Sequence, residues 1–396
     1  MNIRNWLIPF VLHPVSAAFK ALCRPQNQES TIVLSLFTGL FCFCMVAPNE
    51  GMDLYRYLHS LEYIETQTLS DKSDIYIFII QKFVSTFTKN GHVLMLMFGL
   101  ICGYFFAKSV RILTIDISSI RLTLLVILFS SIFSLATLCG VRQCTAFYLL
   151  FWGAVSFLYT SKWKYLLLAC SSLLIHFSFA SYCLILLISI FLKNKPKISL
   201  IVFVFSFFIS VSGLNSLIES RISLLGSAAE AKTMGYLEVD YIDFQIEYAA
   251  SLASQAIPIF YSVELIFFII ICLYCVYKTD YLEEKKHIIY SCSFVLLLLS
   301  FYNLVATIPH LGIRTQQIVC AIMLYPIIRF LHEIEIRKLY RDLIFYTIIS
   351  SGFIVFWFEI RKIVEIMPWS MLILPAPLTS LSDVTVFDVL QILGLH

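Results

Sequence analysis

Long apolar stretches recur along this chain and limit its fold more than any other feature. A helix needs about 20 predominantly apolar residues to cross the hydrocarbon core of a bilayer. Only 13% of the 396 residues are charged, against about 25% in a typical soluble domain. We therefore predict an all-α, polytopic integral membrane protein. The stretches that qualify as spans run near residues 31–48, 92–107, 122–138, 143–159, 198–214, 256–277, 288–305, 313–330 and 342–360.

The loops between these stretches predict an orientation, because short loops rich in Lys and Arg remain in the cytoplasm. Residues 49–74 and 215–256 have the opposite balance, since each segment contains six acidic and two basic residues. We predict that both face the outer, periplasmic side. The basic loops that we assign to the cytoplasm are residues 108–121, 162–164, 193–197, 278–286 and 329–341.

Two segments need a special arrangement if the loops are to alternate between the two sides. Residues 74–89 mix apolar and polar side chains, and we predict a helix in the outer interface rather than a full span. The apolar stretch near 165–192 has basic residues at both ends, which predicts a short helical hairpin that turns near His176 and Ser178. The alternative is one long tilted helix, which breaks the sidedness rule. With these segments we expect about 10 to 12 transmembrane segments.

We predict a single polytopic membrane domain over residues 1–396, because the sequence shows neither an internal repeat nor a soluble catalytic domain. Its outer loops are residues 49–91 and 215–256. Residues 361–396 form a C-terminal tail that prolines break into pieces too short to span. Residues 5–23 lack a small-residue cleavage site, and we expect either a weak first span or an amphipathic helix on the inner surface.

Most of the 12 cysteines lie within apolar runs and are expected to pack as small core residues. Cys272 and Cys275 form a C-x-x-C pair inside an apolar helix, but no second pair and no histidine lies near them in the sequence. We therefore predict neither a metal site nor a cofactor.

Charged residues at the edges of apolar spans are costly, so each is a candidate functional residue. The first group lies in residues 49–63, where Glu50, Asp53 and Arg56 alternate with tyrosines directly after a span. In a helix, Asp53, Arg56 and Tyr57 share one face, because their spacing is i, i+3 and i+4. The alternative interpretation is an interfacial helix with an aromatic belt and a local ion pair.

Two further groups lie at predicted turns. Arg142 and Gln143 occupy a very tight outer turn between two spans, and Arg142 has no acidic neighbour in the sequence. The alternative role of Arg142 is a helix-end residue whose side chain extends to lipid phosphate. His176 and Ser178 lie at the predicted hairpin turn, where the alternative is a histidine satisfied within the protein core.

The last group begins a late span, where Arg314 and Gln317 follow His310. The alternative is again an arginine that extends to headgroup phosphate. Glu264 lies about two turns inside its own span and is a weaker candidate, because it is also suited to pair with Arg314 or Arg142.

The arginines Arg56, Arg142 and Arg314 all fall on the predicted outer side, and His176 approaches them from within the membrane. Arginine presents planar, permanently charged donors that bind phosphate oxygens in pairs. The spans contain too few carboxylates to match three guanidiniums. We therefore predict a diphosphate site, and an undecaprenyl-diphosphate-linked sugar is the substrate class that fits it.

In order and spacing, these motifs resemble the Wzy-type O-antigen and exopolysaccharide repeat-unit polymerases, more closely their EpsG-like branch. The resemblance covers about residues 30–330, with Cys144 and Thr145 standing where small residues are expected and the 215–256 loop matching no pattern. The motifs that carry it are Gly51 and Asp53 followed by Arg56 and Tyr57, then Gly140 to Gln143, then His176 and Ser178, and finally Arg314.

The resemblance implies a metal-independent glycosyltransferase that polymerises lipid-linked repeat units at the periplasmic face of the bacterial inner membrane, for O-antigen of lipopolysaccharide, capsule or exopolysaccharide. One undecaprenyl-diphosphate-linked chain is the donor and another is the acceptor. In this scheme Arg142 and Arg314 bind the diphosphate, and Arg56 is either a third ligand or the partner that orients Asp53. The candidates for the base that accepts the hydroxyl proton are Asp53, His176 and Glu50. The supporting residues are Tyr57, Gln143, Ser178 and Gln317.

Two other classes of protein stay open at this point. A flippase or transporter for the same lipid-linked sugar also needs outward arginines. A membrane O-acyltransferase also has a buried histidine in an apolar turn. The expected partners are the lipid-linked oligosaccharides, membrane lipids and, by family analogy, a chain-length-determining co-polymerase, and we expect no nucleic acid.

Overall fold

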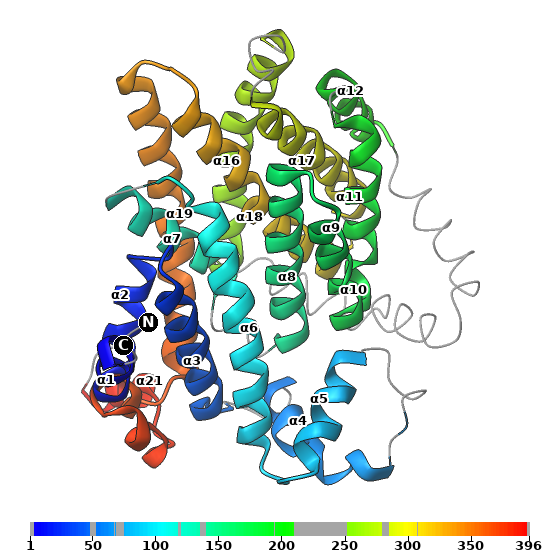
Figure 1. Ribbon diagram of the computed structural model, residues 1–396. Helices are drawn as coiled ribbons and strands as arrows, with labels where there is room; N and C mark the ends of the chain where they lie inside the picture. Colours follow the sequence, from blue (N-terminus) through cyan, green and yellow to red (C-terminus); the bar gives the residue numbers. More distant parts are fainter. Residues whose placement is uncertain are drawn as a thin grey trace. The chain divides into compact units, whose positions relative to one another are not determined.

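Helices are the only regular elements found in the residues that the structure describes (Figure 1). The computed structural model describes residues 4–47, 53–66, 68, 75–117, 120–134, 140–193, 195–209, 252–278, 285–306 and 308–393. By length and composition, six helices in this part of the chain are suited to cross a membrane. They are α6 (Gly91–Leu113), α8 (Val141–Thr160), α16 (Leu252–Tyr277), α17 (Lys286–Val305), α18 (Pro309–Glu333) and α19 (Lys338–Ile366).

The described residues also form shorter apolar helices. The predicted total of 10 to 12 membrane segments counted such shorter segments together with the long spans. Among them, α12 ends at Ser206, well before the end of the stretch predicted at 198–214. The all-α, polytopic membrane class predicted from hydropathy is confirmed. The shorter apolar helices are α3 (Gln28–Cys44), α5 (Ile75–Ser85), α7 (Ile120–Ile132), α9 (Trp163–Cys170) with α10 (Ser172–Ile175), α11 (Ala180–Leu192) and α12 (Pro196–Ser206).

The amino-terminal segment forms two helices, α1 (Arg4–Leu12) and α2 (Pro14–Leu22). Pro14 begins α2, as suits a residue without an N–H, and the His13 side chain accepts a hydrogen bond from the Ser16 N–H at 3.2 Å. Each helix has nine residues, a rise of about 13 Å. Neither helix is long enough to span a bilayer by itself.

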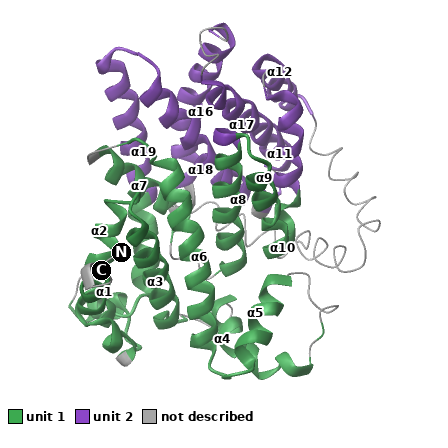
Figure 2. Ribbon diagram, in the orientation of Figure 1, with its two compact units in different colours: residues 1–157, 161–180, 356–396 green, residues 158–160, 181–355 purple. Residues whose placement is uncertain are grey.

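The described chain forms two compact units (Figure 2). Unit 1 comprises residues 1–157, 161–180 and 356–396, and unit 2 comprises residues 158–160 and 181–355.

In unit 1, α3 and α6 pack closely along their length. Gly99 and Gly103 make this approach possible, since an added Cβ at Gly99 would come within 2.5 Å of the Thr38 carbonyl oxygen. Small residues spaced four apart are a general device for close packing of membrane helices. The Ser35 hydroxyl adds a hydrogen bond to the Leu100 carbonyl at 2.6 Å.

The segment after α3 packs against α6 and carries the first group of polar candidates. It forms α4 (Asp53–His59), then η1 (Ser60–Glu62), η2 (Ile64–Thr66) and α5. Helix α5 has 11 residues, a rise of about 16 Å, which fits the predicted interfacial helix better than a full span.

Between the basic loops at 162–164 and 193–197, the helix is interrupted where the sequence predicts a turn. After α9 and α10, His176 adopts extended backbone (φ −148°, ψ 117°), and η5 (Phe177–Phe179) leads into α11. The alternative of one continuous tilted helix is therefore wrong.

In unit 2, α17 is the central helix, and its residues 288–300 and Val305 are buried. It packs against α12 and α18, and α16 also packs against α18. The Asn303 amide of α17 donates to the Ser206 hydroxyl of α12 at 2.8 Å, a polar link between two apolar helices.

After α19, the carboxyl-terminal tail forms short elements, as its prolines predict. They are α20 (Ser370–Ile373), η8 (Ala376–Leu381) and α21 (Val386–Ile392). Thr385 and Asp388 form a capping box at the start of α21. The hydrogen bond from the Thr385 backbone N–H, and to a smaller extent the one from its hydroxyl, lowers the pKa of Asp388. Helix α19 runs to Ile366, several residues beyond the predicted start of the tail at 361.

We predict that Gly99→Leu prevents close packing of α3 and α6, because the new side chain would meet backbone atoms that cannot move aside. Overpacking of this kind costs about 1–3 kcal/mol or more. The measurement is the yield and thermal stability of detergent-solubilised protein by size-exclusion chromatography. Gly140→Ala is the matched control, since an added Cβ at Gly140 meets nothing within 4 Å. Equal stability of the two variants would contradict the assigned role of Gly99.

Candidate functional site

The structure brings three predicted residues of unit 1 into one ion cluster. Asp53 begins α4, and its Oδ1 lies 3.1 Å from Nη2 of Arg56, one turn later on the same helix face. Its Oδ2 lies 3.9 Å from Nη2 of Arg142, in the first turn of α8. The acidic partner that Arg142 lacks in the sequence is therefore supplied by a distant segment.

The cluster lies at the edge of the protein, where water and headgroups can reach it. The side chain of Arg56 is 69% exposed, that of Asp53 38% and that of Arg142 30%. Each guanidinium has five N–H donors in a planar fork. This arrangement suits an anion with several oxygen acceptors.

Helix α4 is held in place by its apolar face. Leu54 and Tyr57 are buried, and the Tyr57 ring meets the Phe98 ring of α6 edge to face, with 5.9 Å between centroids. Tyr57 thus supports the cluster by fixing the helix that carries Asp53 and Arg56. Gln143, the neighbour of Arg142, is half-buried.

Helix α5 contacts both η1, which follows α4, and α10, which precedes His176. The Gln81 amide of α5 donates to the Ser60 hydroxyl in η1 at 2.8 Å, and α10, which ends just before His176, packs against α5. His176 is half-buried, with its ring 6.0 Å from that of Phe179. Ser178 lies in the following turn and is half-buried as well.

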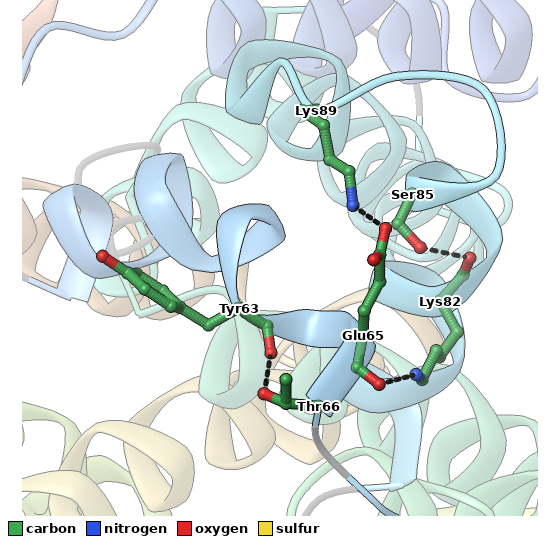
Figure 3. Close-up of polar contacts among 6 residues, drawn as sticks. All are labelled: Tyr63, Glu65, Thr66, Lys82, Ser85 and Lys89. Atoms are coloured by element: carbon green, nitrogen blue, oxygen red, sulfur yellow. Dashed lines mark hydrogen bonds and ion pairs between the residues drawn. The ribbon is translucent and has the colours of Figure 1, made fainter.

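A second ion pair fixes the loop on the exposed side of α5 (Figure 3). The Lys89 ammonium binds the Glu65 carboxylate, and Lys82 donates to the Glu65 backbone carbonyl at 3.5 Å. Ser85 and Thr66 bond to carbonyls within their own turns. Sequence reasoning did not single out this cluster, because Glu65 and Lys89 lie far apart along the chain.

In unit 2, Arg314 and Gln317 lie one turn apart at the start of α18, and both are half-buried. The adjacent Thr315 hydroxyl is 2.9 Å from the Tyr182 hydroxyl of α11. Glu264 is fully buried and lies beside the Cys320 thiol. Among the described residues of unit 2, no ion pair links Glu264 to Arg314, contrary to one of the pairings considered from the sequence.

Two buried charge clusters were missed by sequence reasoning. In unit 2, Arg329 is 1% exposed and lies 3.7 Å from Glu333, which His287 contacts at 3.1 Å. In unit 1, the buried Glu359 carboxylate pairs with Lys362 at 2.6 Å and accepts a hydrogen bond from Ser134. The i, i+4 and i, i+3 spacings within α18 and α19 were the available signal.

Some predicted features lie outside the described residues. These are Glu50, Gly51 and most of the acidic loop at 215–256. In the ranges that the structure does describe, no group of three or more His, Cys, Asp or Glu side chains is placed to hold a metal ion.

The fold and the ion cluster define the class: a multi-pass, all-α membrane protein with paired arginines beside a carboxylate. Residues 32–372, most of the chain, match the sequence model of the EpsG family. The chain therefore belongs to the EpsG family, and the predicted resemblance is confirmed. Membership indicates a polymerase-type glycosyltransferase of polysaccharide biosynthesis. No curated protein and no solved structure matches the chain significantly.

The Glu65–Lys89 pair makes the loop before α6 sensitive to acid. The hydrogen bond and charge of Lys89 lower the pKa of Glu65, so the pair stabilises the loop above the pKa of Glu65 in the unfolded chain. This stabilisation is lost as the pH falls below the ordinary pKa of a glutamate and through the lowered pKa of Glu65 in the folded protein. We predict that hydrogen exchange across residues 63–66 and 75–89, corrected for the intrinsic pH dependence, then rises.

Two variants separate this effect from general acid unfolding. Glu65→Gln should show the faster exchange already at neutral pH, whereas Glu62→Gln, at a neighbouring exposed carboxylate, should behave as wild type. Identical exchange in all three proteins would show that the ion pair does not hold the loop.

Proposed function

We propose that the protein polymerises undecaprenyl-diphosphate-linked oligosaccharide repeat units by glycosyl transfer at the periplasmic face of the bacterial inner membrane. In the reaction, the bond between the donor's reducing-end sugar and its diphosphate breaks. A new bond forms from the anomeric carbon to an acceptor hydroxyl oxygen, the hydroxyl proton passes to a base, and undecaprenyl diphosphate leaves. Membership of the EpsG family supports this class of reaction.

The observation that carries the proposal is the placement of Arg56 and Arg142 around Asp53. Asp53 orients both guanidiniums, whose planar, paired donors match the oxygens of a diphosphate. Negative charge grows on the diphosphate as the glycosidic bond breaks. Fixed guanidiniums at the edge of a low-dielectric region stabilise that charge strongly. Arg142 is therefore the proposed primary ligand, and Arg56 the partner that orients Asp53.

We propose the remaining roles as follows. Because Asp53 is engaged with two arginines, we assign the base to His176, whose imidazole suits proton transfer near neutral pH. Glu50 stays a further candidate. Arg314, with Gln317 beside it on α18, keeps the role of diphosphate ligand that the family resemblance implies. The scheme uses no metal ion and no cofactor, and a chain-length-determining co-polymerase is a proposed partner by family analogy.

We predict that Arg142→Ala lowers kcat/KM for polymerisation by at least about 100-fold, the scale seen when one charge-stabilising donor is removed. Arg142→Lys should also be impaired by at least about tenfold, because an ammonium does not reproduce the guanidinium fork. The measurement is turnover of a defined lipid-linked repeat unit by purified protein in liposomes. Arg361→Ala is the control in the same unit, since this arginine is 73% exposed and pairs only locally with Glu365. Normal long-chain product from Arg142→Ala would remove this residue from the mechanism.

Asp53→Asn tests whether Asp53 orients arginines or accepts the proton. If Asp53 only orients the arginines, its loss should lower kcat/KM by about 10- to 100-fold. This is the effect of removing residues that orient the ligands of a metal ion. A loss as large as that of His176→Ala would instead assign the base to Asp53. The readout is kcat and KM measured separately in the same liposome assay.

A deletion strain separates the polymerase from the flippase. A glycan core that bears one repeat unit indicates a missing polymerase, whereas a core without any repeat unit indicates a missing flippase. Acyl transfer by the purified protein, without glycan extension, would support the acyltransferase instead.

A further inference from the structure

Unit 1 contains a small cavity among α2, α3, α6, α7 and α8, with a volume of about 80 Å³. Its lining includes Ser130 from α7, Phe133 and Ser134 directly after α7, and Cys144 and Tyr148 from α8. All five helices belong to the same unit, so the cavity is a feature of unit 1 alone.

The polar groups on the cavity wall are already engaged with the protein. The Ser130 hydroxyl donates to the Val126 carbonyl at 2.6 Å, and the Tyr148 hydroxyl donates to the Phe133 carbonyl at 2.6 Å. Ser134 donates to the Glu359 carboxylate. A buried water needs two to four polar partners, and cavities that lack them stay dry and accept apolar molecules. The chemistry of the wall therefore favours a hydrocarbon.

The cavity and the ion cluster share helix α8. Cys144, in the cavity lining, lies two residues after Arg142 in the first turn of this helix. A lipid whose diphosphate is held at Arg142 has its chain attached directly to that diphosphate. The chain therefore begins beside the helices that line the cavity.

We propose that this cavity receives a methyl-branched segment of the polyprenyl chain whose diphosphate binds at Arg142. The inference rests on the proposed function and deepens it, since it names the part of the lipid carrier that the site distinguishes. A cavity of about 150 Å³ accepts benzene, so the present one has room for about three or four carbons. That is the size of an isoprenoid branch point, whereas a straight acyl chain has no branch to place there.

The test compares two carriers that bear the same sugar and diphosphate, one with a polyprenyl chain and one with a straight alkyl chain of equal length. For wild type, kcat/KM should favour the polyprenyl carrier by about fourfold or more, the value of about 0.8 kcal/mol for one buried methylene. Ser130→Leu fills the cavity and should remove this preference. An unchanged preference in Ser130→Leu, or no preference in wild type, would overturn the proposal.

Ser131→Leu is the matched control. Ser131 is adjacent on α7 and makes the same kind of hydrogen bond, to the Ile127 carbonyl at 2.8 Å, but it does not line the cavity. This variant should keep the preference for the polyprenyl carrier. Loss of the preference in both variants would attribute the effect to a general disturbance of α7 and overturn the proposal.

A binding measurement keeps the inference separate from the proposed polymerase activity. Polyprenyl diphosphate with a photoreactive group near the diphosphate should label peptides of α7 and α8 in wild type and much less in Ser130→Leu. Unlabelled polyprenyl phosphate should compete, whereas a straight-chain phospholipid should not. Labelling without turnover would contradict the proposed polymerase activity and still support the polyprenyl site in the cavity. Labelling elsewhere, or competition by the phospholipid, would refute the polyprenyl assignment.

Discussion

The absence of water from the bilayer core is the constraint on which the rest of this structure depends. Inside hydrocarbon, backbone N–H and C=O groups need partners within the protein, and a helix provides them within one segment. Apolar side chains gain little from contact with each other there, so close packing must hold helices together. Gly99 and Gly103 have no side chain, so the backbone of α6 packs directly against α3.

The same constraint governs where charge is held. Asp53 with its two arginines lies at the exposed edge of unit 1, where charge is least costly. Glu359 is buried, and its charge is balanced by Lys362 and by the Ser134 hydroxyl. The buried Arg329 is likewise matched by Glu333. Glu359 and Arg329 are thus paired within their own helices, whereas the buried Glu264 has no ion pair among the described residues.

The EpsG family, the arginine cluster and the cavity lead to one view of how a lipid-linked sugar is handled. The family indicates polysaccharide polymerisation. In the proposed scheme, the ion cluster binds the diphosphate and the cavity beside the first turn of α8 receives part of the chain attached to it. Unit 1 would then bind both the head and the tail of the lipid carrier.

The sequence by itself determined the all-α membrane class, the approximate positions of the long spans, the break at His176 and the family. These features depend on hydropathy, helix periodicity and short ordered motifs, which are local properties of the chain. It also placed Asp53 and Arg56 on one helix face, because they are three positions apart. Only the tertiary structure decided that Arg142 shares this carboxylate, that Glu65 binds Lys89, that Ser134 meets Glu359, and that a cavity lies beside α8. Such partners come from segments distant in the sequence, and packing, which hydropathy does not encode, selects them.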